Sequence, residues 1–242
     1  MPLTHHVILI TGAGGGLGST AAIALAKNGA HIILLDNNVK KLEAVYDAIL
    51  AANGPEPILY PFDLAGANEN EYQELADRID EKYGSLQGLL HSAAEFSAFT
   101  PLAIHGTKEW GHILNVNLNA PFLLTRVLLP VLQKSSQASV VFTSDSSARQ
   151  AKAYFGAYGV SKIALEGLSG ILAEELESSR KIRVNVLIPG PVDSPLRKRA
   201  YPGENKEKLP AMAALEPVYL YLFGAQSIGT TGQQVDARTF HL

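Results

Sequence analysis

The chain has 242 residues, 47% hydrophobic and 18% charged, with a formal net charge of −3 at pH 7. This composition predicts one core in one domain spanning residues 1–242, and it argues against partners such as nucleic acid or anionic membranes, which need clustered basic residues. The absence of cysteine excludes disulfides, thiolate catalysis and cysteine-ligated zinc, and we predict no metal site. No signal-peptide pattern is present, and no apolar stretch reaches the ~20 residues of a membrane span, so we expect a soluble cytoplasmic protein.

Short runs rich in β-branched residues alternate with longer amphipathic runs along the whole chain. The predicted strands are residues 7–10, 31–35, 58–62, 88–91, 139–143, 183–188 and 233–236. The predicted helices are residues 17–28, 40–52, 69–83, 107–132, 158–178 and 209–223. Nearly continuous apolar strands indicate burial on both faces of a parallel sheet. We therefore predict an α/β fold: a doubly wound parallel sheet of about seven strands with helices on both faces.

One loop-like segment, residues 191–210, follows the sixth predicted strand and is rich in proline, glycine and charge. It can be a plain solvated connection. Ligands of such sheets bind beyond the carboxyl ends of the strands, however, so we favour a substrate lid over residues 191–210.

The first predicted strand leads directly into Thr11-Gly12-Ala13-Gly14-Gly15-Gly16-Leu17-Gly18 and then into an alanine-rich helix. Glycines at this place allow a tight turn and a close approach of the backbone to phosphates, and the N–H groups at a helix N-terminus favour an anion. A flexible turn would have the same composition. The position of this glycine segment between the first strand and the first helix, however, favours a pyrophosphate cradle. No Gly-Lys-Ser/Thr follows, which excludes a P-loop.

Asp36 closes the second predicted strand, eighteen positions after Gly18. This is close to the ~20 positions at which an acidic residue accepts hydrogen bonds from the adenosine ribose. Asp36 can also be the N-cap of the next helix. An ionised Asp36 would repel a 2′-phosphate, and the following Asn37 and Asn38 are neutral, so the sequence predicts NAD in preference to NADP.

Tyr158 and Lys162 lie four positions apart at the start of the helix that follows the fifth strand, and therefore share one helical face. A nearby positive charge lowers the pKa of a phenol from ~10. Such a tyrosine exchanges a proton with a substrate alcohol or carbonyl while a hydride moves to or from nicotinamide. Alone, this spacing usually means surface packing; after the glycine turn, we interpret the pair as catalytic.

These motifs stand in an order that resembles the short-chain dehydrogenase/reductase family along essentially the whole chain. The residues that carry the resemblance are Thr11-Gly12 with Gly16 and Gly18, Asp63, Asn117, Tyr158 with Lys162, and Pro189-Gly190. Through Val141-Phe142-Thr143-Ser144 the chain looks most like bacterial oxidoreductases of this family that have no defined substrate. The resemblance implies a Rossmann fold, a small-molecule secondary alcohol or carbonyl substrate, and a homodimer or homotetramer assembled through the helices around 107–132 and 158–178.

The resemblance also implies residue roles. Tyr158 would be the general acid/base, Lys162 would lower the pKa of Tyr158 and bind the nicotinamide ribose, and Asn117 would hold a water that connects Lys162 to solvent. Asp63 and Leu64 would flank the adenine. The residues implied to bind the cofactor are Gly12, Gly15, Gly16, Leu17, Gly18, Asp36, Asn37, Asp63, Leu64, Ser92, Ala93, Ala94, Tyr158, Lys162, Pro189, Gly190 and Val192, the last three against the nicotinamide.

Two departures from the family pattern affect binding and assembly. His91-Ser92-Ala93-Ala94 replaces Asn-Asn-Ala-Gly, and the methyl group of Ala94 lies where the backbone normally approaches the cofactor, so a modest loss of affinity is expected. Asp236-Ala237-Arg238 replaces Asp-Gly-Gly, which bears more on subunit packing than on chemistry.

The third departure is at the catalytic centre. Asp145 lies thirteen positions before Tyr158, where the family has a serine that donates a hydrogen bond to the reacting oxygen. An ionised carboxylate only accepts, and it repels an alkoxide and a phenolate. Three alternatives follow. Asp145 is protonated and donates the hydrogen bond in place of the serine; or Ser144 or Ser146 takes over the role of the serine; or catalysis is lost and the protein only binds the dinucleotide. Both serines point to the opposite face of an extended strand, so replacement requires a turn or bulge.

Two functions follow from these residues. The first is an NAD(P)-dependent oxidoreductase that uses Tyr158, Lys162 and Asn117. The alternative is a non-catalytic dinucleotide-binding protein, redox-sensing or a partner of another protein, which Asp145 and Ala94 favour. The aromatic residues that either line a substrate pocket or pack in the core are Phe96, Phe99, Tyr154, Phe155 and Tyr201.

Overall fold

Seven strands form one sheet in the computed structural model, which describes residues 2–241, and every pair of neighbouring strands is parallel. In chain order they are β1 (Val7–Thr11), β2 (His31–Asp36), β3 (Ile58–Pro61), β4 (Gly88–His91), β5 (Ala138–Thr143), β6 (Ile182–Ile188) and β7 (Gln234–Asp236). Their order across the sheet is β3-β2-β1-β4-β5-β6-β7. All seven predicted strands are therefore present, and their ends differ from the prediction by at most one residue.

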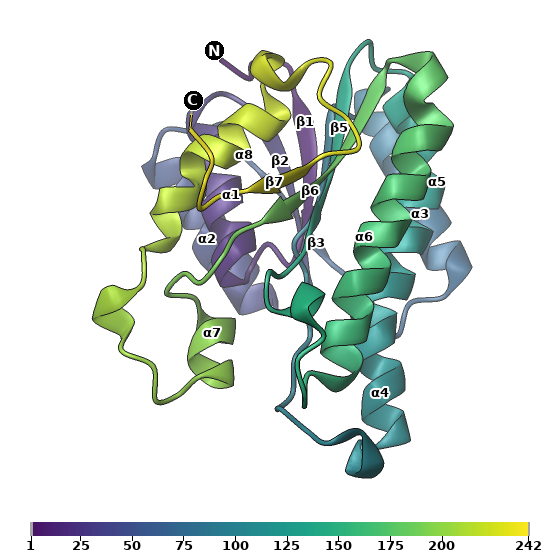
Figure 1. The fold of residues 1–242 in the computed structure, drawn as a ribbon. Helices are drawn as coiled ribbons and strands as arrows, with labels where there is room; N and C mark the ends of the chain where they lie inside the picture. Colours follow the sequence, from purple (N-terminus) through teal and green to yellow (C-terminus); the bar gives the residue numbers. More distant parts are fainter. Residues whose placement is uncertain (1, 242) are drawn as a thin grey trace.

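Helices cover both faces of the sheet (Figure 1). One face carries α1 (Gly16–Lys27), α2 (Val39–Ala51) and α8 (Glu216–Phe223), and the other carries α3 (Glu69–Tyr83), α5 (Ala120–Gln133) and α6 (Gly156–Leu176). Successive strand side chains enter opposite cores, as Ile8 and Leu9 do in β1. The predicted doubly wound α/β fold is confirmed.

Two predicted helices differ from the structure. The predicted helix 107–132 is divided into α4 (Thr107–Leu114), a π-helical segment (Asn115–Asn119) and α5. A π-helical turn leaves the apolar pattern continuous, so the periodicity does not reveal it. The predicted helix 209–223 is also too long, because α8 begins only at Glu216, with Pro217 in its first turn, after the 3₁₀ turn Met212–Leu215.

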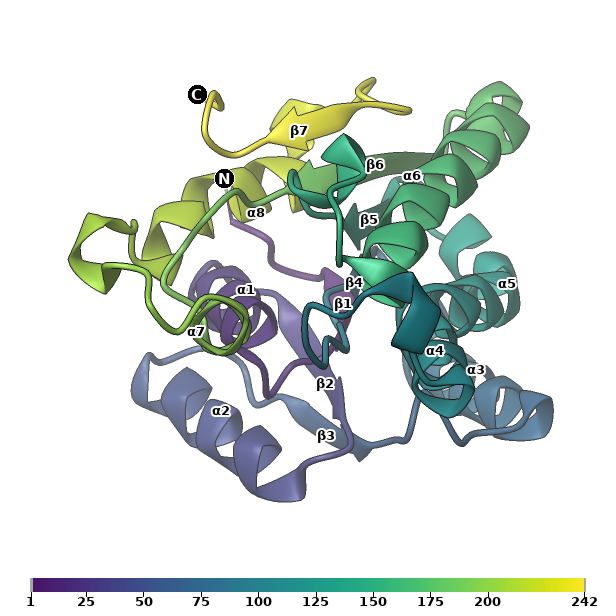
Figure 2. The same ribbon diagram turned by 60° about the horizontal axis from the view of Figure 1, so that its bottom comes forward.

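The carboxyl ends of the parallel strands lie at one end of the sheet. Successive strands are added on one side of β1 up to β3 and on the other side from β4 onward, so the strand order changes direction between β1 and β4. The predicted lid 191–210 lies at this end of the sheet and contains α7 (Pro195–Ala200), next to the start of α1 (Figure 2). A Cβ added to Gly16 would lie 2.7 Å from Cδ of Pro195. The segment therefore packs against the glycine turn, while its function as a lid stays a prediction.

Several apolar side chains remain exposed on the helices that the resemblance assigns to subunit contacts. Phe122 of α5 and Val160, Ile163 and Ile171 of α6 are 46–61% exposed. The predicted homo-oligomer stays a prediction. Within residues 2–241, no helix is long and apolar enough to cross a membrane.

Candidate active site

A cleft with a volume of about 390 Å³ runs along the carboxyl edge of the sheet. All residues predicted to bind the cofactor line it, and so does Asp145, whereas Asn117 lies behind its wall. Lining residues that the sequence motifs did not single out include Lys41, Phe62, Glu95, Ser194, Arg197 and Arg199. The fold thus gathers segments from six strand ends around one cavity.

The glycine turn is shaped by close backbone contacts. Gly12 has a φ of +63°, and a Cβ added to it would lie 2.6 Å from Cα of Ala93. A Cβ added to Gly18 would lie 2.2 Å from the carbonyl oxygen of Gly12. No side chain caps the start of α1 at Gly15. The N–H groups of its first turn are therefore available to an anion.

Thr11 connects the carboxyl end of β1 to that of β4 by hydrogen bonds, a role that the sequence pattern did not assign. Its hydroxyl oxygen accepts hydrogen bonds from the N–H groups of Ser92 and Ala93, both at 3.1 Å. The hydroxyl donates to the carbonyl of Leu90 at 3.4 Å. The segment after β4 is thereby held against the glycine turn.

Asp36 supports the glycine turn from the end of β2. Its Oδ2 accepts a hydrogen bond from the N–H of Gly14 at 3.1 Å, and its Oδ1 accepts one from the N–H of Asn38 at 3.0 Å. The alternative that Asp36 caps α2 is wrong, because the N-cap is Asn38, whose side chain accepts from the N–H of Lys41. Each carboxylate oxygen of Asp36 keeps a further lone pair for a ligand hydroxyl.

Two buried hydroxyls test whether the cleft fits a dinucleotide. Ser92 Oγ and Thr143 Oγ1 belong to cleft-lining residues and find no hydrogen-bond partner among residues 2–241. Buried polar groups in folded proteins are nearly always hydrogen-bonded. These hydroxyls, the uncapped start of α1 and the free acceptor sites of Asp36 fit a ligand with phosphates and ribose hydroxyls.

Tyr158 and Asp145 form a direct hydrogen bond at the inner end of the cleft. The Tyr158 hydroxyl donates to Oδ2 of Asp145 at 2.9 Å, and Oδ1 of Asp145 accepts from the N–H of Ser147 at 2.7 Å. Burial and the Asp145 carboxylate raise the pKa of Tyr158 well above 10, with Tyr201 adding to the rise and Arg197 opposing it. Asp145 thus stands where a substrate-orienting group would act.

Lys162 lies behind the phenol without a hydrogen bond to it. Its Nζ donates to the carbonyl of Thr143 at 2.9 Å and is 5.8 Å from the centre of the Tyr158 ring. Burial lowers the pKa of Lys162 to about 8, and Asp145 partly opposes this shift. From the sequence we expect Lys162 to lower the pKa of Tyr158, but in the structure that pKa is raised.

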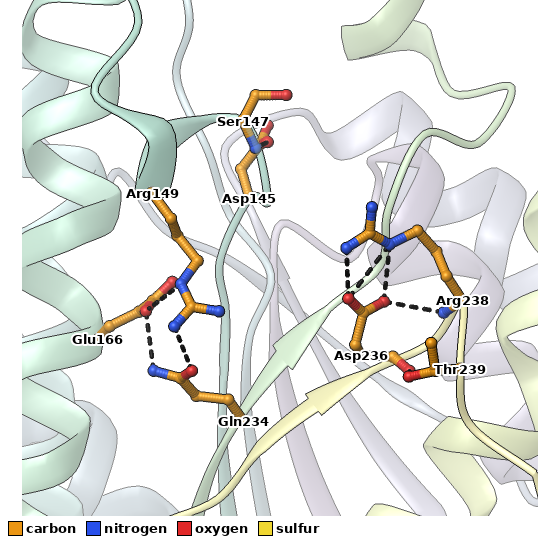
Figure 3. A network of polar contacts seen from close by, with 8 residues as sticks. All are labelled: Asp145, Ser147, Arg149, Glu166, Gln234, Asp236, Arg238 and Thr239. Atoms are coloured by element: carbon orange, nitrogen blue, oxygen red, sulfur yellow. Dashed lines mark hydrogen bonds and ion pairs between the residues drawn. The ribbon is translucent and has the colours of Figure 1, made fainter.

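Ser144 does not take the place of Asp145. Its hydroxyl donates to Oε1 of Glu166 on α6 at 2.5 Å. Glu166 also forms an ion pair with Arg149 at 3.0 Å and accepts from Gln234 of β7 at 3.0 Å (Figure 3). The Ser144 hydroxyl is thus occupied by Glu166, and the group bonded to Tyr158 is the carboxylate of Asp145, two residues after the end of β5.

Asn117 lies in the π-helical segment and is completely buried. Its Nδ2 donates to the carbonyl of Glu95 and to the hydroxyl of Ser161, both at 3.0 Å, and its Oδ1 accepts from the N–H of Glu95 at 2.7 Å. The side chain therefore joins the segment after β4 to α6. The predicted water that would connect Lys162 to solvent stays a prediction.

The sequence pattern of the family described as short chain dehydrogenase matches residues 6–205. The chain belongs to the short-chain dehydrogenase family. It is 39% identical over 236 residues to the uncharacterized oxidoreductase YciK of Escherichia coli K12, covering 98% of this chain and 93% of YciK. The family makes the protein an oxidoreductase that binds a nicotinamide dinucleotide, and this result favours the enzyme over a non-catalytic binding protein.

Two solved structures of relatives share the fold of this dehydrogenase with TM-scores of 0.94. A Shigella flexneri relative in complex with NADP is 39% identical, covering 98% of both chains. An Escherichia coli CFT073 relative in complex with NADPH is also 39% identical, again covering 98% of both chains. The expected resemblance to bacterial oxidoreductases of this family is confirmed.

An aromatic pocket of the dehydrogenase adjoins Tyr158 and Asp145. Four of the five aromatic residues considered in the sequence line it, namely Phe96, Phe99, Phe155 and Tyr201. Tyr154 is 57% exposed and does not belong to the lining. The remaining wall comes from the α7 segment, through Leu196, Arg197 and Ala200.

Arg197 brings a positive charge into this pocket, where it is already compensated. Its Nε and Nη2 donate to the carboxylate of Glu204, each at 2.7 Å. Its guanidinium lies 4.1 Å from the centre of the Tyr201 ring. A second ion pair, between Arg199 of α7 and Glu95, crosses the cleft at 3.4 Å. Only the folded chain brings these partners together.

Proposed function

We propose that this dehydrogenase transfers a hydride between a nicotinamide dinucleotide and the carbon of a secondary alcohol or carbonyl compound, with Tyr158 as general acid/base. The observation that carries the proposal is the buried Tyr158 hydroxyl, which lies in the cofactor cleft beside an aromatic pocket. When bound, the nicotinamide supplies or accepts the hydride. A spectrophotometric screen of secondary alcohols and ketones, with wild type and Tyr158→Phe, tests this function.

The residues of the chain handle the proton. In reduction, Tyr158 Oη donates a proton to the substrate oxygen, and in oxidation it accepts one. Lys162 lies behind the phenol, and its ammonium form stabilises a phenolate. Asp145 opposes phenolate formation, because two negative charges would stand 2.9 Å apart.

We propose NAD(H) as the preferred cofactor because of Asp36. A 2′-phosphate would lie beside the Asp36 carboxylate, whereas a ribose hydroxyl would donate to it. The relatives in complex with NADP and NADPH do not support this preference. Lys41, in the first turn of α2, also lines the cleft and is a cation that a 2′-phosphate could contact.

Asp36→Ser should shift the preference from NAD toward NADP by about tenfold to a hundredfold, because a charged hydrogen-bond acceptor for the ribose is lost. Calorimetric titration with NAD, NADH, NADP and NADPH measures the change. Lys41→Ala is the matched control, and it should weaken NADP binding and leave NAD binding nearly unchanged. Tighter binding of NADP than NAD by the wild type would contradict the preference.

Asp145→Ser should raise turnover of ketones and alcohols and should move the pH profile of alcohol oxidation to lower pH. Oxidation requires Tyr158 to accept a proton, so its rate rises with pH through the pKa of Tyr158. The Asp145 carboxylate raises that pKa, and its removal should lower the midpoint by about one unit or more. Asp145→Asn, which removes the charge alone, should show the same shift. Unchanged or reduced turnover would mean that Asp145 is no obstacle.

A further inference from the structure

The Tyr158–Asp145 pair presents acceptors to a substrate. The single hydroxyl proton of Tyr158 is donated to Oδ2 of Asp145, and Oδ1 accepts the Ser147 N–H. Both residues line the cleft, so the groups left for a ligand are lone pairs on Tyr158 Oη and on the carboxylate. A carbonyl oxygen needs a donor at this place. An N–H group needs an acceptor, and here it finds two.

The charges around the pair favour a cationic ligand. None of the ion pairs in the described part of the chain includes Asp145. Lys162 directs its Nζ to the carbonyl of Thr143, and Arg197 is held by two hydrogen bonds to Glu204. The half-buried carboxylate of Asp145 lines the cleft and forms an ion pair with neither cation. A positively charged group of a ligand in the cleft can therefore pair with it.

The walls next to the carboxylate are aromatic. The Phe96 ring lies 5.4 Å from the Tyr158 ring and 5.1 Å from the Phe99 ring, and Phe99 lies 5.2 Å from Tyr201. Aromatic rings attract cations through their π faces and bury planar apolar groups. The pocket between these rings holds only about 20 Å³, so the body of a substrate that reaches Asp145 lies in the adjoining cleft of about 390 Å³, with the rings as its apolar wall.

We propose that the preferred substrate of this dehydrogenase is an aryl or cyclic imine, bound as the iminium cation with its N–H donated to Asp145. The inference rests on the proposed hydride transfer between the nicotinamide and the substrate, and it replaces the C=O group of the substrate by C=N, which needs no proton from Tyr158. It assigns to Asp145 the recognition of the reacting nitrogen.

The reaction balances without a donor from Asp145. A hydride from the reduced nicotinamide forms a C–H bond at the iminium carbon, and the C=N π electrons become the lone pair of the nitrogen. The iminium is reduced to a neutral secondary amine, and the nicotinamide is oxidised. The amine then takes a proton from solvent. No proton has to leave Tyr158 at the moment of hydride transfer, so the Tyr158–Asp145 hydrogen bond can stay intact.

Binding of the product tests the inference without turnover. Tetrahydroisoquinoline, a secondary ammonium cation at neutral pH, and the neutral alcohol indanol are titrated calorimetrically into the full-length protein with and without NAD. Wild type should bind the ammonium at least about tenfold more tightly, as expected for a hydrogen bond to a charged group. Asp145→Ser and Asp145→Asn should abolish the difference. Asp80→Asn, which removes a carboxylate that pairs with Lys134 on the surface, should retain it.

Turnover of the matched pair dihydroisoquinoline and indanone gives the second measurement. The ratio of kcat/KM for imine over ketone should exceed about ten in wild type and should fall by tenfold to about a hundredfold in Asp145→Ser. Turnover of ketone in preference to imine by wild type, or an unchanged ratio in Asp145→Ser, would overturn the inference and leave the proposed function intact. Turnover of neither compound class by wild type and Asp145→Ser would overturn both.

Discussion

Replacing Tyr158 by phenylalanine should lower the turnover number for an alcohol or carbonyl substrate by roughly 10²–10⁴-fold, the range typical of losing a general acid/base. The substitution removes one oxygen and keeps the ring that packs against Phe96. Because the ring and the glycine turn remain in place, cofactor affinity should change little. Steady-state kinetics on any substrate found in the screen, together with calorimetric titration of NADH, separates these two effects.

Tyr154→Phe is the matched control, since Tyr154 is 57% exposed and lies outside both the cleft and the aromatic pocket. It removes the same atom from a tyrosine four residues earlier and should leave turnover unchanged. If Tyr158→Phe retained near wild-type turnover with a carbonyl substrate, proton transfer would have to pass through another group and Tyr158 would not be the acid/base. A protein that turned over no substrate and still bound the cofactor would support the binding-protein alternative.

Gly18→Ala should lower kcat/KM by about a hundredfold, the cost of roughly a 1 Å displacement in a cofactor site. The new Cβ would lie 2.2 Å from the carbonyl oxygen of Gly12 and 2.8 Å from its carbonyl carbon. Both contacts are with backbone, so the turn itself has to move. The same overpacking should lower the free energy of unfolding by about 1–3 kcal/mol, measurable by urea denaturation.

Gly167→Ala is the control for this change. Gly167 lies on α6, and a Cβ added to it would meet nothing within 4 Å. The substitution should raise the free energy of unfolding by about 0.5–1 kcal/mol, because alanine favours a helix interior over glycine. NADH binding weakened equally by both substitutions would show that the effect is general and not due to the turn.

Sequence periodicity was sufficient for the sheet because its strands are short, apolar and separated by amphipathic helices. The strand ends could be placed within one residue. Gly29 and Gly84, for example, mark the loops that precede β2 and β4. The π-helical segment at Asn117 could not be predicted, because one extra residue in a turn leaves the order of apolar and polar residues unchanged.

For the site, the motifs predicted many of the residues that line the cleft, because most of them follow a strand end and Tyr158 and Lys162 share one face of α6. What they did not predict depends on partners distant in sequence. Glu95 meets Arg199 across more than a hundred residues. Side-chain geometry adds that Asp145 is bonded to Tyr158 and that Ser144 is bonded to Glu166, whereas the effect of Asp145 on catalysis stays a prediction.

The bonds between Glu166, Arg149 and Gln234 make the outermost strand of the sheet part of the support of the catalytic centre. Gln234 of β7 donates to the glutamate that also accepts the hydroxyl of Ser144, the residue before Asp145 (Figure 3). The strand at the edge of the sheet thus supports, through one side chain, the segment that positions the partner of Tyr158. A substitution of Gln234 should therefore disturb the catalytic centre from a residue that does not line the cleft.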